Sequence, residues 1–144
     1  PPLPLALALA TSVPLAAGEN MISAQDFARG ISKPALDVIQ PDLCKWGGIS
    51  GVLPVAKDIM AAGKRYCPHY LGGGIGLAAS AHVLAAVGGD GMLEIDSNDN
   101  PLRNILFAPP VTQGQLTLSE TPGLGVVDQF ANLLASDIGK GETR

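Results

Sequence analysis

The chain repeats one pattern, in which a short apolar segment ends at a polar or glycine-rich loop and a helical stretch then follows. Helices are predicted to begin at Ser23, Ser50 and Gly76. The second and third of them are predicted to end at Gly63 and Gly88. The apolar segments are predicted strands, over residues 13–17, 35–40, 65–67 and 91–95. Strands that alternate with helices are typical of a parallel sheet with right-handed crossovers, so the sequence predicts an α/β fold.

The residues after the fourth predicted strand follow a different pattern. A polar loop is predicted over 97–103, an edge strand over 115–118 and a final amphipathic helix over 126–138. Residues 1–10 are apolar, and we expect them to be the tail of a helix that leads into the first strand. That run is too short to span a membrane and lacks the positively charged start of a signal peptide. No membrane association is therefore expected.

Charge and cysteine content exclude several classes of protein. The net charge is −4 and the longest basic run is Lys64-Arg65, so a nucleic-acid surface is not expected. Two cysteines, Cys44 and Cys67, are too few for a disulfide scaffold. We expect both to be reduced core residues of a cytoplasmic enzyme. A hydrophobic fraction of 47% with only 15% charged residues suits a well-buried α/β core.

Ionisable side chains stand at the ends of the four predicted strands, namely Glu19, Asp42, His69 and Glu94. In parallel α/β folds the loops at the carboxyl ends of the strands carry the chemistry. We expect Asp42 to hydrogen-bond the ring of His69, which would fix the ring's tautomer and make it a competent general base. The plainer alternative is that these residues are unrelated polar caps. For Glu19 that alternative is a helix-entry acid near Ser23.

The glycine-rich loop over 72–76 precedes a helix, as phosphate-binding loops do. It lacks the Lys-Ser/Thr pair of such loops and matches no dinucleotide-binding pattern, so we expect a tight loop that lets backbone approach a substrate. His82, within the third predicted helix, is expected to be a core histidine. Lys45 lies three residues after Asp42 and is expected near the rim of the site. A structural role and a catalytic role are equally open for it.

Five motifs carry a resemblance to a known family. They are Ala17-Gly-Glu-Asn20, Pro41-Asp-Leu-Cys-Lys-Trp-Gly-Gly-Ile49, Pro68-His69, Leu93-Glu94 and Pro122-Gly-Leu-Gly125. Together they resemble the C-terminal part of the enolase superfamily, in its mandelate racemase-like (mandelate racemase/muconate lactonizing enzyme) branch. The resemblance implies strands five to eight of a modified (β/α)8 TIM-type barrel with a C-terminal extension. It also implies Mg²⁺ as the cofactor and removal of the proton α to a carboxylate.

The resemblance assigns a role to each residue at the strand ends. Glu19 is implied to be a metal-ligand carboxylate on the fifth barrel strand. Asp42 and His69 are implied to be a catalytic dyad on strands six and seven. Glu94, on strand eight, is implied to be the acid that hydrogen-bonds the substrate carboxylate.

A complete barrel of this kind needs about 250 residues, and the family adds an N-terminal capping domain. We therefore expect residues 1–100 to be half of a barrel, and residues 101–144 to be an extension that packs on the barrel or the capping domain. Two of the three expected carboxylate ligands and the opposite-face Lys base are absent from this sequence, so the chain alone is expected to be inactive. Its expected partners are the missing barrel half, the capping domain, a small carboxylate substrate and further copies of the parent in a homo-oligomer.

The implied function is that of a Mg²⁺-dependent dehydratase, a lyase, acting on an acid sugar or related hydroxy acid. The alternative is an isomerase, a racemase or epimerase of a hydroxy acid or an amino-acid derivative. A third hypothesis belongs to another class: a non-catalytic half-barrel that is stable only by assembly, because its sheet edges and inner face would be open.

Overall fold

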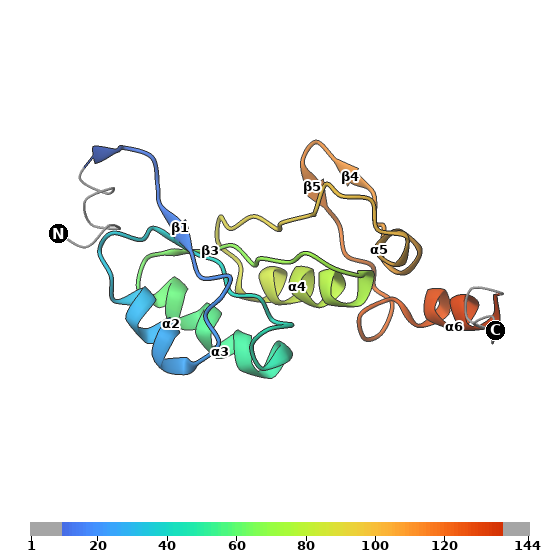
Figure 1. The fold of residues 1–144 in the computed structure, drawn as a ribbon. Coiled ribbons are helices and arrows are strands. Elements are labelled where there is room, and N and C mark those ends of the chain that lie inside the picture. The colour runs from blue at the N-terminus through green and yellow to red at the C-terminus, as the bar shows by residue number, and fades with distance from the viewer. Residues whose placement is uncertain (1–9, 137–144) are drawn as a thin grey trace.

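The computed structural model describes residues 10–136 (Figure 1). Its first part is a three-stranded parallel sheet in the order β1-β2-β3, in which Ala16 pairs with Val38 and Val38 with Arg65. The strands are β1 (Ala16–Ala17), β2 (Val38–Ile39) and β3 (Arg65–Tyr66), and the helices between and after them are α2 (Ala24–Ile31), α3 (Gly48–Ala61) and α4 (Gly74–Val87). The predicted parallel α/β arrangement is therefore confirmed.

The ends of the helices follow from local sequence. Ser23 Oγ accepts the amide of Asp26 at 3.1 Å and donates to its carboxylate at 2.6 Å, so the predicted cap of α2 is confirmed. Gly63, with φ +69°, ends α3 as predicted. The amide of Lys64 then donates to the carbonyl of Ile59 at 3.1 Å and closes the last turn. Both α3 and α4 begin slightly before the predicted positions.

Residues 91–95, predicted as a fourth strand, run beside β3 without forming a ladder with it. The amide of Met92 donates to Sγ of Cys67 at 3.3 Å, and not to a strand carbonyl. Gly91 lies so close to β3 that a Cβ there would overlap the carbonyl oxygen of Tyr66. The segment thus has the place of a strand but not its hydrogen bonds, and the prediction of a fourth strand is wrong in this respect.

The hydrophobic core lies between the sheet and the helices. Ile39 and Tyr66 are fully buried there against Phe27 of α2 and against Val52 and Ile59 of α3. Successive strand residues point to opposite faces, so their neighbours face the other side of the sheet. A groove of about 390 Å³ lies on that side, lined among others by Ala16, Val38, Gln40, Cys67, Met92 and Glu94.

The second part of the chain is smaller. It consists of α5 (Pro101–Leu106), an antiparallel hairpin of β4 (Val111–Thr112) and β5 (Gln115–Leu116), and α6 (Val127–Ala135). Helix α5 packs against α4, and α6 lies at the far end of the molecule from the sheet (Figure 1). β5 forms only the first half of the edge strand predicted over 115–118, whereas α6 confirms most of the predicted last helix.

The polar loop predicted over 97–103 gives way to a helix. Asn100 Oδ1 accepts the amide of Arg103 at 3.1 Å and caps α5, whose first residue is Pro101. Proline at the first helical position loses no hydrogen bond and has a suitable φ, so Asn100-Pro101 begins a helix here and does not break one.

Three further predictions concern single residues or the chain ends. Cys67 is buried as predicted, whereas Cys44 is exposed because it lies in the loop after β2 and not on the strand; both are free thiols. The helix expected over residues 1–10 and the last residues of the helix expected to reach 138 lie outside the described residues, apart from residue 10. Among the helices of residues 10–136, none combines the length and the apolar character that a bilayer crossing requires.

Candidate active site

His69 is the centre of a group of ionisable side chains at the carboxyl end of the sheet. Its amide donates to the carbonyl of Pro41 at 3.2 Å, which continues the pairing of β2 and β3 beyond the strands themselves. The residue is only 6% exposed. Its ring Nδ1 lies 2.6 Å from Oε2 of Glu94, and its Nε2 lies 3.5 Å from Oε2 of Glu19. The ring therefore lies between two carboxylates, one from the loop after β1 and one from the segment over 91–95.

Glu94 binds both the ring and the backbone next to it. The carboxylate oxygen that faces Nδ1 of His69 also accepts the amide of Tyr70 at 3.3 Å. A carboxylate can only accept, so this contact selects the form of the ring that carries its proton on Nδ1. In the neutral ring, a proton on Nδ1 leaves the lone pair on Nε2. Nε2 is then the atom that can take a proton from a bound molecule.

Asp42 is buried but does not contact His69. Its Oδ1 accepts the amides of Cys44 at 2.8 Å and Lys45 at 3.3 Å, so the carboxylate closes a turn within its own loop. No hydrogen bond or ion pair joins Asp42 to His69 in the described part of the chain. The expected hydrogen bond between them is therefore wrong, because Asp42 is turned to its own backbone and Glu94 takes the Nδ1 position.

Lys45 connects the loops that carry Asp42 and Glu19. Its Nζ lies 3.8 Å from Oδ2 of Asp42 and donates to Oδ1 of Asn20 at 3.2 Å. Asn20 in turn donates to Oε1 of Glu19 at 3.1 Å. Three of the four residues singled out in the sequence, His69, Glu94 and Glu19, thus meet directly, and Asp42 joins them through this chain of contacts.

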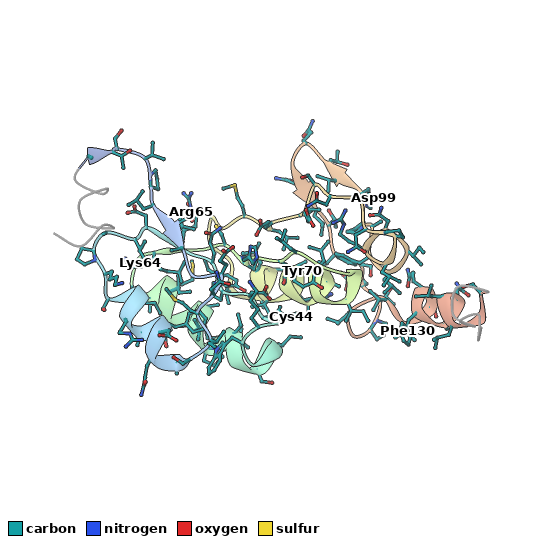
Figure 2. The ribbon with its side chains drawn as sticks, viewed as in Figure 1. Cys44, Lys64, Arg65, Tyr70, Asp99 and Phe130 are labelled. Atoms are coloured by element: carbon teal, nitrogen blue, oxygen red, sulfur yellow. The ribbon has the colours of Figure 1, made fainter. Side chains whose placement is uncertain are left out.

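Tyr70 and Cys44, both labelled in Figure 2, lie beside the site without supplying a nucleophile. Although Cys44 is exposed as a residue, desolvation of its thiol by the surrounding loop raises the pKa of that thiol, and the Asp42 carboxylate raises it further. Burial also raises the pKa of the Tyr70 hydroxyl, so both groups are neutral near pH 7. The Tyr70 ring packs on the glycine-rich loop, where a Cβ at Gly72 would lie 2.5 Å from its hydroxyl oxygen. Close packing therefore accounts for glycine at this position, as expected of a tight loop.

Glu19 is the residue implied to be a metal ligand, and its side chain is 51% exposed. Mg²⁺ requires a near-octahedral set of oxygen ligands and usually binds one or two protein carboxylates with water and substrate. Within residues 10–136 there is no group of three or more acid, histidine or cysteine side chains that could hold a metal ion. These residues therefore do not form a metal site by themselves, and Glu19 fits such a site only as one ligand among others.

Sequence reasoning missed two contributors to the site. Asn20 stands beside Glu19 in the first motif and so left a trace in the sequence. The backbone amide of Tyr70 left none, because any residue except proline supplies the same donor.

The comparisons with known proteins concern the family and the fold of the chain. Residues 5–129 match the model of the family described as enolase C-terminal domain-like. The D-galactarolactone cycloisomerase of Agrobacterium fabrum is 32% identical over 79% of this chain and 33% of its own length. The arabinonate dehydratase of Saccharolobus solfataricus is also 32% identical, over 83% of this chain and 32% of its own length. The chain thus spans about a third of the length of these two relatives.

A solved structure extends the match to three dimensions. The mandelate racemase/muconate lactonizing enzyme of Bordetella bronchiseptica RB50 is 52% identical and superposes with a TM-score of 0.82 over 92% of this chain and 38% of that one. The sheet and helices described above are therefore the C-terminal half of a (β/α)8-type barrel. The chain belongs to the enolase superfamily, in its mandelate racemase/muconate lactonizing enzyme branch.

Proposed function

We propose that this chain is the C-terminal part of a Mg²⁺-dependent dehydratase that removes the proton α to the carboxylate of a sugar acid and then eliminates water. The observation that carries the proposal is the position of His69, whose ring is held by Glu94 with Nε2 turned to the side of Glu19. The substrate class rests on the names of the two curated relatives, which act on derivatives of sugar acids.

In this proposal His69 acts first as the base. Glu94 accepts the hydrogen bond from Nδ1, which orients the ring and stabilises the imidazolium that forms when Nε2 takes the α-proton. The imidazolium can then return that proton to the departing β-hydroxyl, so one water leaves for each proton first removed. Burial of His69 limits competition from solvent for the same nitrogen.

The remaining residues have supporting roles in the proposal. A Mg²⁺ ion held by Glu19 and by ligands outside residues 10–136 would supply Lewis-acid stabilisation of charge on the substrate carboxylate. Lys45 and Asn20 fix the direction of the Glu19 carboxylate through their hydrogen bonds. Asp42 keeps the loop of Lys45 in place, so its contribution to the site is indirect.

We further propose that the open face of the sheet is covered by the remainder of a longer polypeptide. The groove of about 390 Å³ on that face extends to Glu94, so a partner seated there would also close the site from one side. Cycloisomerisation of a sugar-acid lactone is the second candidate reaction, since the Agrobacterium fabrum relative is named for it.

The test is an assay of the full-length polypeptide that contains this chain, with Mg²⁺ and a panel of aldonic and aldaric acids. Dehydration is expected to give a 2-keto-3-deoxy acid, and in D₂O the substrate is expected to exchange its α-proton. His69→Asn is expected to lose both activities, whereas His82→Asn, which alters the chain's other histidine, is expected to keep them. Turnover that survives His69→Asn would overturn the proposal, and an isomer formed without keto acid would favour the second candidate.

A further inference from the structure

The turn that follows Glu94 is tied to α5 by a buried arginine. Arg103 is 8% exposed, and its Nη2 donates to the carbonyl of Asn98 at 2.7 Å. Its Nη1 lies 3.9 Å from Oδ2 of Asp96. Asp96 itself accepts the backbone and side-chain amides of Asn98 at 2.9 and 2.8 Å. The guanidinium therefore holds both ends of the turn over 96–98, which begins just after Glu94.

Helix α5 also packs against the segment that follows His69. Helix α4 begins at Gly74, shortly after His69, and a Cβ at Gly74 would lie 2.7 Å from Cβ of Leu106 and 2.9 Å from the carbonyl oxygen of Arg103. The backbones of α4 and α5 are thus in close contact at this point, with no room for a side chain. Helix α5 therefore contacts both the start of the helix that follows His69 and the turn that follows Glu94.

We infer that Arg103 is a positioning residue, which sets the geometry of the His69–Glu94 pair by fixing the turn after Glu94 against α5. The inference deepens the proposed function and rests on it for its catalytic meaning. Arg103 is not itself placed to touch a substrate, because its Nη1 is inaccessible to solvent and without a hydrogen-bond partner among the described residues. Its effect on the pair is carried by the backbone from 96 to 94.

The competing explanation is that Arg103 affects only the stability of the fold, since removing one partner of a buried ion pair destabilises a protein. A purely structural role would change the free energy of unfolding and leave the His69–Glu94 hydrogen bond of the folded protein as it is. A positioning role would loosen that hydrogen bond in a chain that remains folded. The two explanations are therefore separated by a measurement on the hydrogen bond itself.

The experiment is NMR spectroscopy of the full-length polypeptide that contains this chain, with ¹⁵N-labelled histidine at one fixed pH. The unaltered chain is expected to give a downfield proton on Nδ1 of His69, protected from exchange with water. In Arg103→Met this proton is expected to exchange about tenfold faster, because the variant loses the hydrogen bond that Arg103 donates to the turn. Arg103→Lys keeps a donor for the Asn98 carbonyl and is expected to fall between the two.

Two further variants make the test decisive. Arg29→Met removes an exposed arginine on α2 and is expected to leave the His69 proton unchanged. Gly74→Ala keeps Arg103 but forces α5 away from α4, so the His69 proton is expected to exchange faster with water. This variant replaces Arg103→Met in the test if Arg103→Met does not fold.

The inference is overturned if the His69 proton exchanges at the same rate in folded Arg103→Met, or in Gly74→Ala should the first variant unfold. An unaltered chain that shows no protected Nδ1 proton would overturn it as well. None of these readouts requires turnover. An unchanged His69 proton would therefore overturn the inference about Arg103 and leave the proposed function standing. Absence of α-proton exchange of the substrate in the full-length enzyme would overturn the proposed function and leave the NMR result on Arg103 as it is.

Discussion

Helices with an apolar face occur in both the sheet-and-helix part of the chain and its C-terminal part, but that face is buried only in the first part. Helix α3 buries Val52, Ala56 and Ile59 completely against the sheet. Helix α6 also carries an apolar stripe, with Val127, Phe130 and Leu134 on one face, yet it contains no buried residue. Figure 2 shows Phe130 at the far end of the molecule from Arg65 on β3.

The difference teaches that an apolar face predicts a helix but does not identify the surface that covers it. Most of the stability of a protein helix comes from packing of its apolar face and not from intrinsic propensity. In the first part that surface is supplied by the chain's own sheet. In the second part the described residues do not supply it, so the two parts are expected to respond differently to substitution.

The largest expected effect concerns catalysis by the chain alone. The first part holds His69 and Glu94 together, but its residues offer only Glu19 as a metal carboxylate. We expect the isolated chain to show no turnover of sugar acids and no Mg²⁺ binding tighter than the millimolar range, measured by a keto-acid assay and by calorimetry. Tight Mg²⁺ binding that disappears in Glu19→Gln would contradict this and would mean that further ligands lie within the chain.

Core truncation should separate the two parts most clearly in stability. Ile59→Ala removes a fully buried side chain between α3 and the sheet and is expected to lower the free energy of unfolding by about 2–5 kcal/mol. Leu134→Ala on α6 is the matched variant and is expected to change it by less than about 0.5 kcal/mol, because that side chain is exposed. Urea unfolding followed by circular dichroism measures both. Equal losses would contradict the distinction between the two parts.

A smaller effect is expected where the fourth segment meets β3. Gly91→Ala would drive a methyl group into the carbonyl of Tyr66 and against Leu84, and is expected to cost about 1–3 kcal/mol. Gly73→Ala is the control, since a Cβ there meets only Cβ of Leu102, at 3.9 Å. Thermal unfolding of the two variants compares them. A neutral Gly91→Ala would mean that residues 91–95 are not held against the sheet.

Much of the first part could be predicted because its local signals and its packing agree. The Ser23 cap, the Gly63 stop and the order of strands and helices each follow from short-range chemistry that the fold does not override. The fourth segment was harder, because its apolar pattern is that of a strand while its amide at Met92 is taken by the sulfur of Cys67. A sequence pattern does not reveal which acceptor an amide will find.

Three of the four strand-end side chains singled out in the sequence do lie together, but the hydrogen-bond pairing expected among them was wrong. His69, Glu94 and Glu19 meet because parallel strands end at one edge, which the sequence pattern does indicate. The choice of Glu94 over Asp42 as the partner of Nδ1 depends on where the Asp42 carboxylate turns, and that is decided by the amides of its own loop. Helix α5, which carries Arg103, was predicted as part of a polar loop although Asn100-Pro101 is a pattern that begins helices.

The smallest expected effect concerns the ion pair at the opposite end of β3 from the site. Arg65 donates to Oδ2 of Asp90 at 2.6 and 2.9 Å, and this lowers the pKa of the Asp90 carboxyl below its ordinary value of 3.8. A carboxyl whose pKa is lower in the folded chain than in the unfolded one stabilises the fold above the unfolded pKa. That contribution is lost as the pH falls through the folded pKa.

We therefore expect Asp90→Asn to be slightly less stable than the unaltered chain at pH 6. The difference is expected to shrink as the pH falls through the lowered folded pKa and to vanish once the carboxyl is protonated in both states. The effect should also shrink in high salt, because the pair is exposed and screened. Asp58→Asn on α3 is the control, since its carboxylate joins no ion pair within residues 10–136. Urea unfolding at several pH values gives the comparison. A difference that persists unchanged at low pH would mean that Asp90 contributes through its turn and not through Arg65.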